Sequence, residues 1–117
     1  MPTIRDLVAA LRERDGVEAA VVLGRDGLVI DSQTAPDMDA ESVAALVPAV
    51  IAAAEEFGEQ VGRGRLNTAI LEYSEGVGVV SALSPDALLL VLARQGANLG
   101  HLLFELRRNR EHIATLV

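Results

Sequence analysis

The sequence has no cysteine and no lysine, and only three of its 117 residues are aromatic. Without cysteine there is no disulfide framework, no thiolate metal site and no cysteine nucleophile. Without lysine there is no P-loop and no Schiff-base chemistry. Acidic residues outnumber basic ones by 17 to 10, a formal net charge of −7. This balance argues against a nucleic-acid partner, which needs a basic face, and against an anionic membrane surface.

Long hydrophobic runs are also missing. The longest uncharged apolar run, residues 43–54, is well short of the ~20 residues that span a bilayer. The N-terminus lacks the basic start and apolar stretch of a signal peptide. We therefore expect a cytoplasmic protein without membrane insertion. Half of the residues are apolar, and the length fits one domain, residues 1–117, with a core that buries roughly 65% of the unfolded surface.

The apolar spacing predicts the element order helix, two strands, helix, three strands, helix. The first helix is capped by Thr3 and stops near Gly16, and the middle helix runs from Asp39 to about Val61, where glycines end it. The strands are expected at Val17–Leu23, Leu28–Ile30, Leu66–Tyr73, Val77–Leu83 and Leu88–Ala93, and a single last helix from near Asn98 through Ile113. Because the strands are apolar on both faces, helices must cover both sides of the sheet.

The middle helix is apolar around most of its circumference. A stripe suited to packing on a sheet consists of Val43, Val47, Val50, Ala54, Phe57 and Val61. The opposite face carries small side chains, Ala45, Ala49 and Ala52, and the arc is widened by Leu46 and Ile51.

A helix that is apolar all round is buried all round, and a second copy of the same helix is the simplest cover for the alanine face. We therefore predict a homodimer with the three alanines, Leu46 and Ile51 at the seam. The carboxylates Glu55, Glu56 and Glu59 would form the rim of this interface. The alternative is that alanine is present only as the best helix former and stays exposed.

No motif for catalysis or for a cofactor is present. Gly58, Gly62 and Gly64 lie at a helix C-terminus, whereas phosphates bind at N-termini, so they are interpreted as a helix stop. His101 and His112 lie on one helix but roughly 16 Å apart, too far to share a metal ion. With no nucleophile–base pair and no metal-ligand spacing, we expect no enzyme activity and no cofactor.

Six of the ten arginines fall into two groups. Arg107, Arg108 and Arg110 lie near a helix C-terminus, where the helix dipole favours cations. Arg25, Arg63 and Arg65 are the more exposed candidates for acting on a partner. An arginine supplied in trans can stabilise the charge that develops in phosphoryl transfer.

Residues 17–32 form an apolar strand, an Asp-Gly turn and a second strand. This segment resembles the opening hairpin of the roadblock / dynein light chain family. The alanine-rich middle helix ending in Gly-x-Gly before a strand is similar to the family too. So is Ala93-x-x-Gly96-Ala97-Asn98-Leu99-Gly100 leading into an amphipathic Leu/Arg helix. The resemblance covers about residues 3 to 116.

The resemblance implies an α/β (α+β) profilin-like or longin-like sandwich. Its five-stranded antiparallel sheet has the middle helix on one face and the terminal helices on the other. Family members pair through the middle helix and the following strand, and bacterial members act on small Ras-like GTPases, among them the regulator of the gliding-motility GTPase. No catalytic residue carries over. We therefore expect a non-catalytic homodimeric module that binds a small Ras-like GTPase and modulates its activity. The alternative is a structural adaptor or scaffold subunit with no direct GTPase contact.

Overall fold

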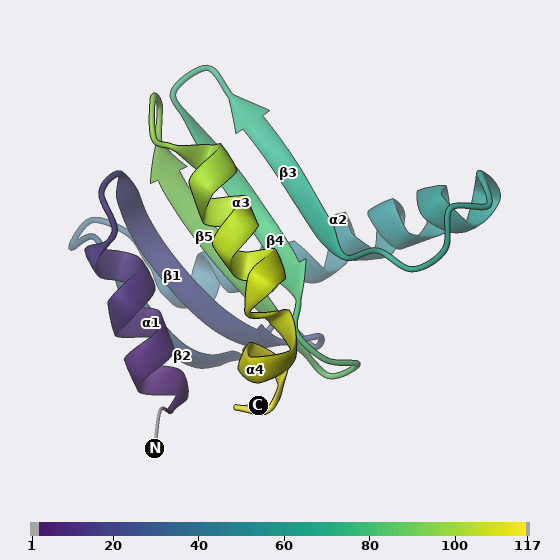
Figure 1. The fold of residues 1–117 in the computed structure, drawn as a ribbon, viewed down its shortest axis with the longest axis horizontal. Coiled ribbons are helices and arrows are strands. Elements are labelled where there is room, and N and C mark those ends of the chain that lie inside the picture. The colour runs from purple at the N-terminus through teal and green to yellow at the C-terminus, as the bar shows by residue number, and fades with distance from the viewer. Residues whose placement is uncertain (1–2, 117) are drawn as a thin grey trace.

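A computed structural model describes residues 3–116, with the exception of the Arg110 side chain. The elements follow the predicted order, with one additional short helix at the end (Figure 1). They are α1 (Ile4–Glu13), β1 (Val17–Gly24), β2 (Val29–Thr34), α2 (Ala40–Gln60), β3 (Thr68–Tyr73), β4 (Gly76–Ala82), β5 (Ala87–Arg94), α3 (Leu99–Arg108) and α4 (Arg110–Ala114).

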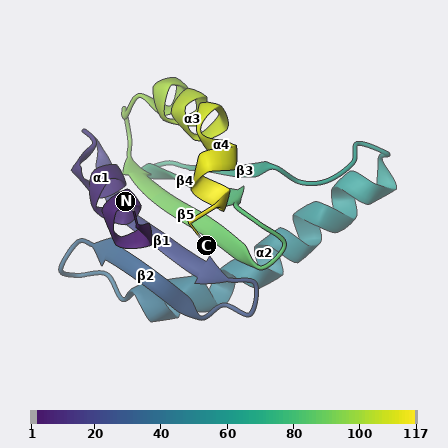
Figure 2. The ribbon, with the colours of Figure 1, turned by 60° about the horizontal axis from the view of Figure 1, so that its bottom comes forward.

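The five strands form one antiparallel sheet in the order β2-β1-β5-β4-β3. The helix α2 crosses one face of this sheet, and α1, α3 and α4 lie on the other (Figures 1 and 2). The predicted fold class, with the middle helix on one face and the terminal helices on the other, is therefore confirmed. The central strands β1 and β5 are buried on both faces, whereas β2 and β3 are the edges.

Each face of the sheet supports its own apolar core. Beneath α1, α3 and α4 lies a cluster that includes Val8, Val22, Val79, Leu89 and Leu102. Beneath α2 lies a second cluster, made of Val21, Leu23, Ala44, Val47, Ile51, Val80, Leu88 and Leu90. Alternation along the strands sends successive side chains into the two cores in turn.

The predicted helix starts are confirmed by their hydrogen bonds. Asp6 N donates to Thr3 Oγ1 at 3.2 Å and Thr3 N donates to Asp6 Oδ2 at 2.9 Å, which completes a capping box. Glu41 N donates to Asp39 Oδ1 at 3.1 Å at the start of α2. After α2, Gly62 and Gly64 have φ values of +66° and +83°, as the predicted stop requires.

Two elements differ most from the predictions, whereas the ends of the other strands differ by no more than two residues. Strand β2 continues to Thr34 instead of ending at Ile30, because an edge strand accepts the polar residues that follow. The last helix is not continuous: α3 ends at Arg108 and α4 begins at Arg110. At the break, Asn109 Nδ2 donates to the carbonyl of Glu105 at 2.9 Å, so its side chain competes with the helical ladder.

The predicted orientation of α2 is wrong for several residues. The helix buries Ala44, Val47 and Ile51 against the sheet, a stripe rotated by roughly 70° from the predicted one at 100° per residue. Ile51 is only 3% exposed and belongs to the core, so its predicted place at a seam between copies is corrected.

Three side chains of α2 that were predicted to pack on the sheet are exposed instead. They are Val50, Phe57 and Val61. The physical reason for the last two is visible in Figure 1, where the C-terminal part of α2 extends past the β3 edge and has no sheet beneath it. Within residues 3–116, no helix combines the length and the apolarity needed to cross a membrane.

Candidate partner interface

The outward face of α2 is the first component of the candidate interface. Ala45, Ala49 and Ala52 are all exposed, and Leu46 beside them is 71% exposed. These residues face away from the sheet because the opposite side of the helix packs on β1 and β2. The alanine face is therefore available to a partner, and its role as a dimer seam stays a prediction.

The second component is the projecting C-terminal end of α2. Phe57 is 70% exposed and Val61 is 45% exposed, so two large apolar side chains stand in solvent beyond the sheet. Sequence reasoning assigned both to the sheet-packing stripe and missed them as surface residues.

The third component is an apolar groove between α2 and the part of the sheet that α2 leaves open. It encloses about 160 Å³ and is lined by Val43, Leu46, Val47, Val50, Leu71, Tyr73, Gly78, Val80, Leu90 and Leu92. Next to it runs the free edge of β3, where Ile70 is also exposed. Of the nine large apolar side chains exposed in the described chain, six lie on α2, at its end or on β3. Such a concentration marks an interaction surface.

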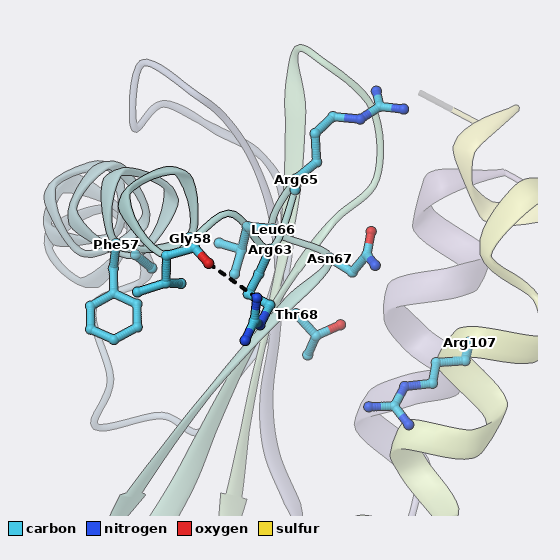
Figure 3. Close-up of a pocket in the computed structure, with 11 residues that line it drawn as sticks. Phe57, Gly58, Arg63, Arg65, Leu66, Asn67, Thr68 and Arg107 are labelled. Atoms are coloured by element: carbon cyan, nitrogen blue, oxygen red, sulfur yellow. Dashed lines mark hydrogen bonds between the residues drawn. The ribbon is translucent and has the colours of Figure 1, made fainter.

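An open pocket of about 680 Å³ lies between the end of α2 and the start of β3 (Figure 3). Arg63 and Arg107 point toward each other across it, with Thr68 between them, whereas Arg65 points away. Arg63 Nη1 donates to the Val61 carbonyl at 3.2 Å. In residues 3–116, none of these three arginines takes part in an ion pair. We call this feature the arginine pocket.

Arg25, the other candidate for acting on a partner, is engaged inside the protomer. Its Nη1 donates to both carboxylate oxygens of Glu55 at 3.1 Å, which ties the β1–β2 turn to α2. Its Nε is buried without a hydrogen-bond partner in the described chain. Glu55 is thus partly neutralised, while Glu56 and Glu59 remain exposed. The Arg110 side chain lies outside the described residues.

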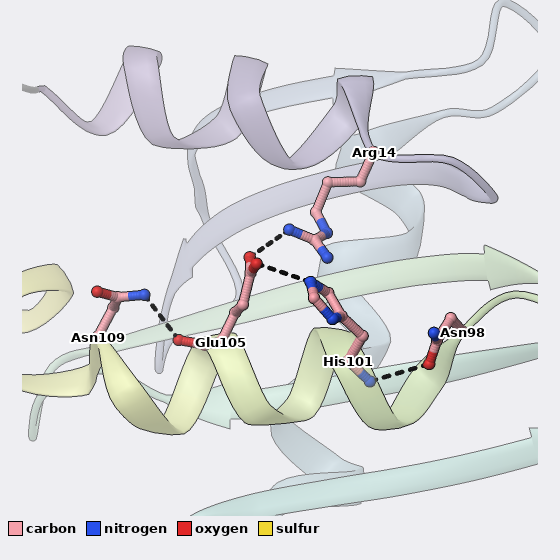
Figure 4. Close-up of polar contacts among 5 residues, drawn as sticks. All are labelled: Arg14, Asn98, His101, Glu105 and Asn109. Atoms are coloured by element: carbon pink, nitrogen blue, oxygen red, sulfur yellow. Dashed lines mark hydrogen bonds and ion pairs between the residues drawn. The ribbon is translucent and has the colours of Figure 1, made fainter.

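The opposite face of the sheet carries a polar network between α1 and α3 (Figure 4). The Glu105 carboxylate accepts from Arg14 and contacts His101 Nε2 at 2.9 Å, and Asn98 Oδ1 caps α3 through His101 N at 3.0 Å. This network holds the end of α1 against α3. Throughout the described residues, no group of three or more His, Asp or Glu side chains is placed to hold a metal ion.

The family model of the Roadblock/LC7 domain matches residues 3–93. The chain belongs to this family. A relative from the archaeon Methanocaldococcus jannaschii, protein MJ1340, is 32% identical over 106 residues, covering 91% of this chain and 92% of the relative.

Solved structures of roadblock proteins share the fold. A Roadblock/LC7 domain from Streptomyces avermitilis superposes with a TM-score of 0.83 at 23% identity, over 96% of this chain and 95% of that one. The gliding protein MglB from Thermus thermophilus gives a TM-score of 0.82 at 20% identity, over 95% of this chain and 85% of that one. A further MglB structure with the same TM-score has a tetrameric arrangement. At these identities the structural likeness establishes the roadblock fold.

Proposed function

We propose that residues 1–117 form a single roadblock domain that acts as a homodimeric, non-catalytic regulator of a small Ras-like GTPase in the cytoplasm. The observation that carries the proposal is the continuous apolar surface formed by the outer face of α2, its projecting end and the groove beside β3. Within residues 3–116, no other helix or strand covers that surface. Roadblock family membership and the MglB fold support the same conclusion.

Two complementary features of one protomer support the proposed homodimer. The projecting end of α2 presents Phe57, and the groove over β3 to β5 is open and apolar. A twofold axis near the β3 edge lets each copy lay its projecting end over the groove of the other, which buries both at once. Ala45, Ala49 and Ala52 then allow the two α2 helices to approach closely.

The GTPase would lie across the paired α2 helices. Interfaces of this kind have an apolar centre and a charged rim, which Glu56 and Glu59 supply together with the Arg25–Glu55 pair. The chain has no nucleophile–base pair, so the chemistry of GTP hydrolysis would belong to the GTPase and its own residues. The proposed partners are a second copy of this chain and the GTPase, and they include neither nucleic acid nor a membrane.

The homodimer is tested with Ala49→Glu, which places a charge at the centre of the seam. Because Ala49 is exposed in the protomer, the substitution leaves the fold intact, but an unpaired buried charge costs a complex about 3–5 kcal/mol. We expect a wild-type dimer and a monomeric variant by size-exclusion chromatography with light scattering. Ala10→Glu is the matched control, since Ala10 is an exposed alanine on α1, and it should remain dimeric. A wild-type monomer at micromolar concentration would contradict the dimer.

The regulatory role is tested with a small Ras-like GTPase encoded beside this chain. Wild-type dimer should bind the GTPase and change its rate of GTP hydrolysis or nucleotide exchange, whereas Ala49→Glu should not. Binding without any change in either rate would instead support the adaptor function. Absence of binding by the intact dimer would remove the GTPase from the proposal.

A further inference from the structure

The free edge of β3 has a defined hydrogen-bonding side. Ala82 N on the neighbouring strand donates to Asn67 O at 3.0 Å, and the ladder continues in the register Ile70↔Val79. Because such bonds alternate along an antiparallel strand, Ile70 and Glu72 direct their backbone N–H and C=O groups away from β4, toward the free edge. The same residues project their side chains to the face that carries α3, since Val79 opposite Ile70 lies in the core beneath that helix.

Pairing of two copies along this edge is restricted by symmetry. A twofold axis perpendicular to the sheet keeps α2 on the same face in both copies, so residues of the α3 face must meet residues of the α3 face. Registers centred on Ile70 or on Leu71 both satisfy this condition with near-complete overlap of β3. The Leu71 register sets Glu72 against the apolar Ile70. The Ile70 register pairs the two exposed Ile70 side chains and sets Glu72 opposite Thr68, and it is therefore favoured.

The Ile70 register also matches charges. Thr68 lines the arginine pocket together with Arg107, which stands on α3 and hence on the same face as Glu72. Within residues 3–116, neither Arg107 nor Glu72 makes an ion pair, although the chain carries a net charge of −7. Glu72 lies near the end of β3, whereas Arg107 on α3 lies beside the start of β3. The two side chains can therefore meet only between two copies whose β3 strands run antiparallel.

Pairing through β3 is what the family resemblance implies; we infer that in this chain the register is centred on Ile70, and that Glu72 of each copy enters the arginine pocket of the other and pairs with Arg107. This inference rests on the proposed homodimer and adds what fixes its register. Twofold symmetry makes the ion pair twice per dimer, once at each end of the shared edge. The same pairs select a second copy of this chain over other roadblock chains that lack the acid–arginine match.

The test uses charge reversal in the full-length protein. Glu72→Arg alone and Arg107→Glu alone each replace two attractions by two repulsions, so the dissociation constant of each homodimer should rise by at least about tenfold. An equimolar mixture of the two variants should dimerise again, because both pairs of the mixed dimer are attractive: one is the original Glu72–Arg107 pair and the other is the reversed pair of the two substituted side chains. The chain carrying both substitutions should likewise form a homodimer. Sedimentation velocity at low and high salt measures all four samples.

Matched controls separate charge from position. Arg108→Glu is the control for Arg107→Glu, because it makes the same charge change one residue along α3 and outside the arginine pocket. Glu13→Arg is the control for Glu72→Arg, because it makes the same charge change at an exposed residue of α1. Both should dimerise like the wild type. A stable wild-type dimer whose affinity is unchanged in both single variants would overturn this inference and leave the homodimer standing. A monomeric wild type would overturn the homodimer and the inference together.

Discussion

Ile51 and Leu46 are both aliphatic residues of α2, yet their environments are opposite. Ile51 is 3% exposed in the core beneath the helix, and Leu46 is 71% exposed on its outer side. Residue type alone could not distinguish them, because both lie within an arc that is apolar nearly all round. Only the neighbours that the fold supplies decide which of them is buried.

This difference predicts two distinct outcomes of truncation to alanine. Ile51→Ala should lower the free energy of unfolding of the protomer by about 2–4 kcal/mol, because it leaves a cavity in the core. Leu46→Ala should change protomer stability by less than about 0.5 kcal/mol and should weaken self-association instead. Urea unfolding in the Ala49→Glu background, which is expected to be monomeric, isolates the first effect. Equal losses for both variants would show that the orientation of α2 differs from that described above.

The helix α2 is longer than the sheet it crosses is wide. The length of the helix can be calculated from the sequence. A helix of 21 residues is about 31 Å long, whereas five strands spaced at about 4.8 Å span roughly 19 Å between the outer two. The projecting end, with Phe57 and Val61, follows from that difference. The predicted stripe failed at Phe57 and Val61 because it assumed a sheet beneath every turn of the helix.

The start of α2 is sensitive to pH through its cap. The hydroxyl of Ser42 donates to Asp39 Oδ2 at 2.6 Å and Glu41 N donates to Oδ1, and these bonds hold the pKa of the Asp39 carboxyl below its usual value of 3.8. A lowered pKa in the folded state stabilises the fold above the unfolded pKa, and the contribution is lost as pH falls through the folded pKa.

Asp39→Asn should therefore be less stable than the wild type at pH 7 and closer to it at pH 3. Asparagine keeps the capping oxygen but not the charge, so the difference should be small at neutral pH. Chemical denaturation at the two pH values measures it. Asp37→Asn, at an exposed carboxylate just before the cap, serves as the control. A gap between wild type and Asp39→Asn that is the same at both pH values would rule out the carboxylate as its source.

Elements with local signals were predictable, and boundaries set by tertiary contacts were not. The caps Thr3 and Asp39 act within one turn of the chain, so their residue types sufficed. Strand β2 extends into polar residues because it lies at an edge, and the arginine pocket joins residues 63 and 107 from different elements. The edge position of β2 and the closeness of residues 63 and 107 both depend on the order of strands in the sheet, which local sequence signals do not give. The exposed alanine face is the part of the candidate interface that the helical period alone could place.

For the whole molecule, the proposed homodimer would couple folding to self-association. The apolar surface on α2 and beside β3 would be removed from water in that dimer, so association would add to the stability of the fold by mass action. The thermal midpoint of the wild type should therefore rise with protein concentration, while that of Ala49→Glu should not. Differential scanning calorimetry across a hundredfold range of concentration checks this. A concentration-independent midpoint for the wild type would show that the surface contributes nothing to stability.

The two edges of the sheet differ in a way that limits the size of the assembly. At the β2 edge, Ser32 N donates to Asp31 Oδ1 at 2.8 Å, so a side chain occupies a backbone donor that an incoming strand would need. The β3 edge carries no such block at Ile70. A subunit with two unpaired sheet edges can assemble head to tail into fibres. A subunit with one unpaired edge pairs with a single other copy through a twofold axis, and assembly then ends at the dimer. In the proposed homodimer, the Asp31 carboxylate would therefore keep the β2 edge unpaired, and its removal would leave both sheet edges open to pairing.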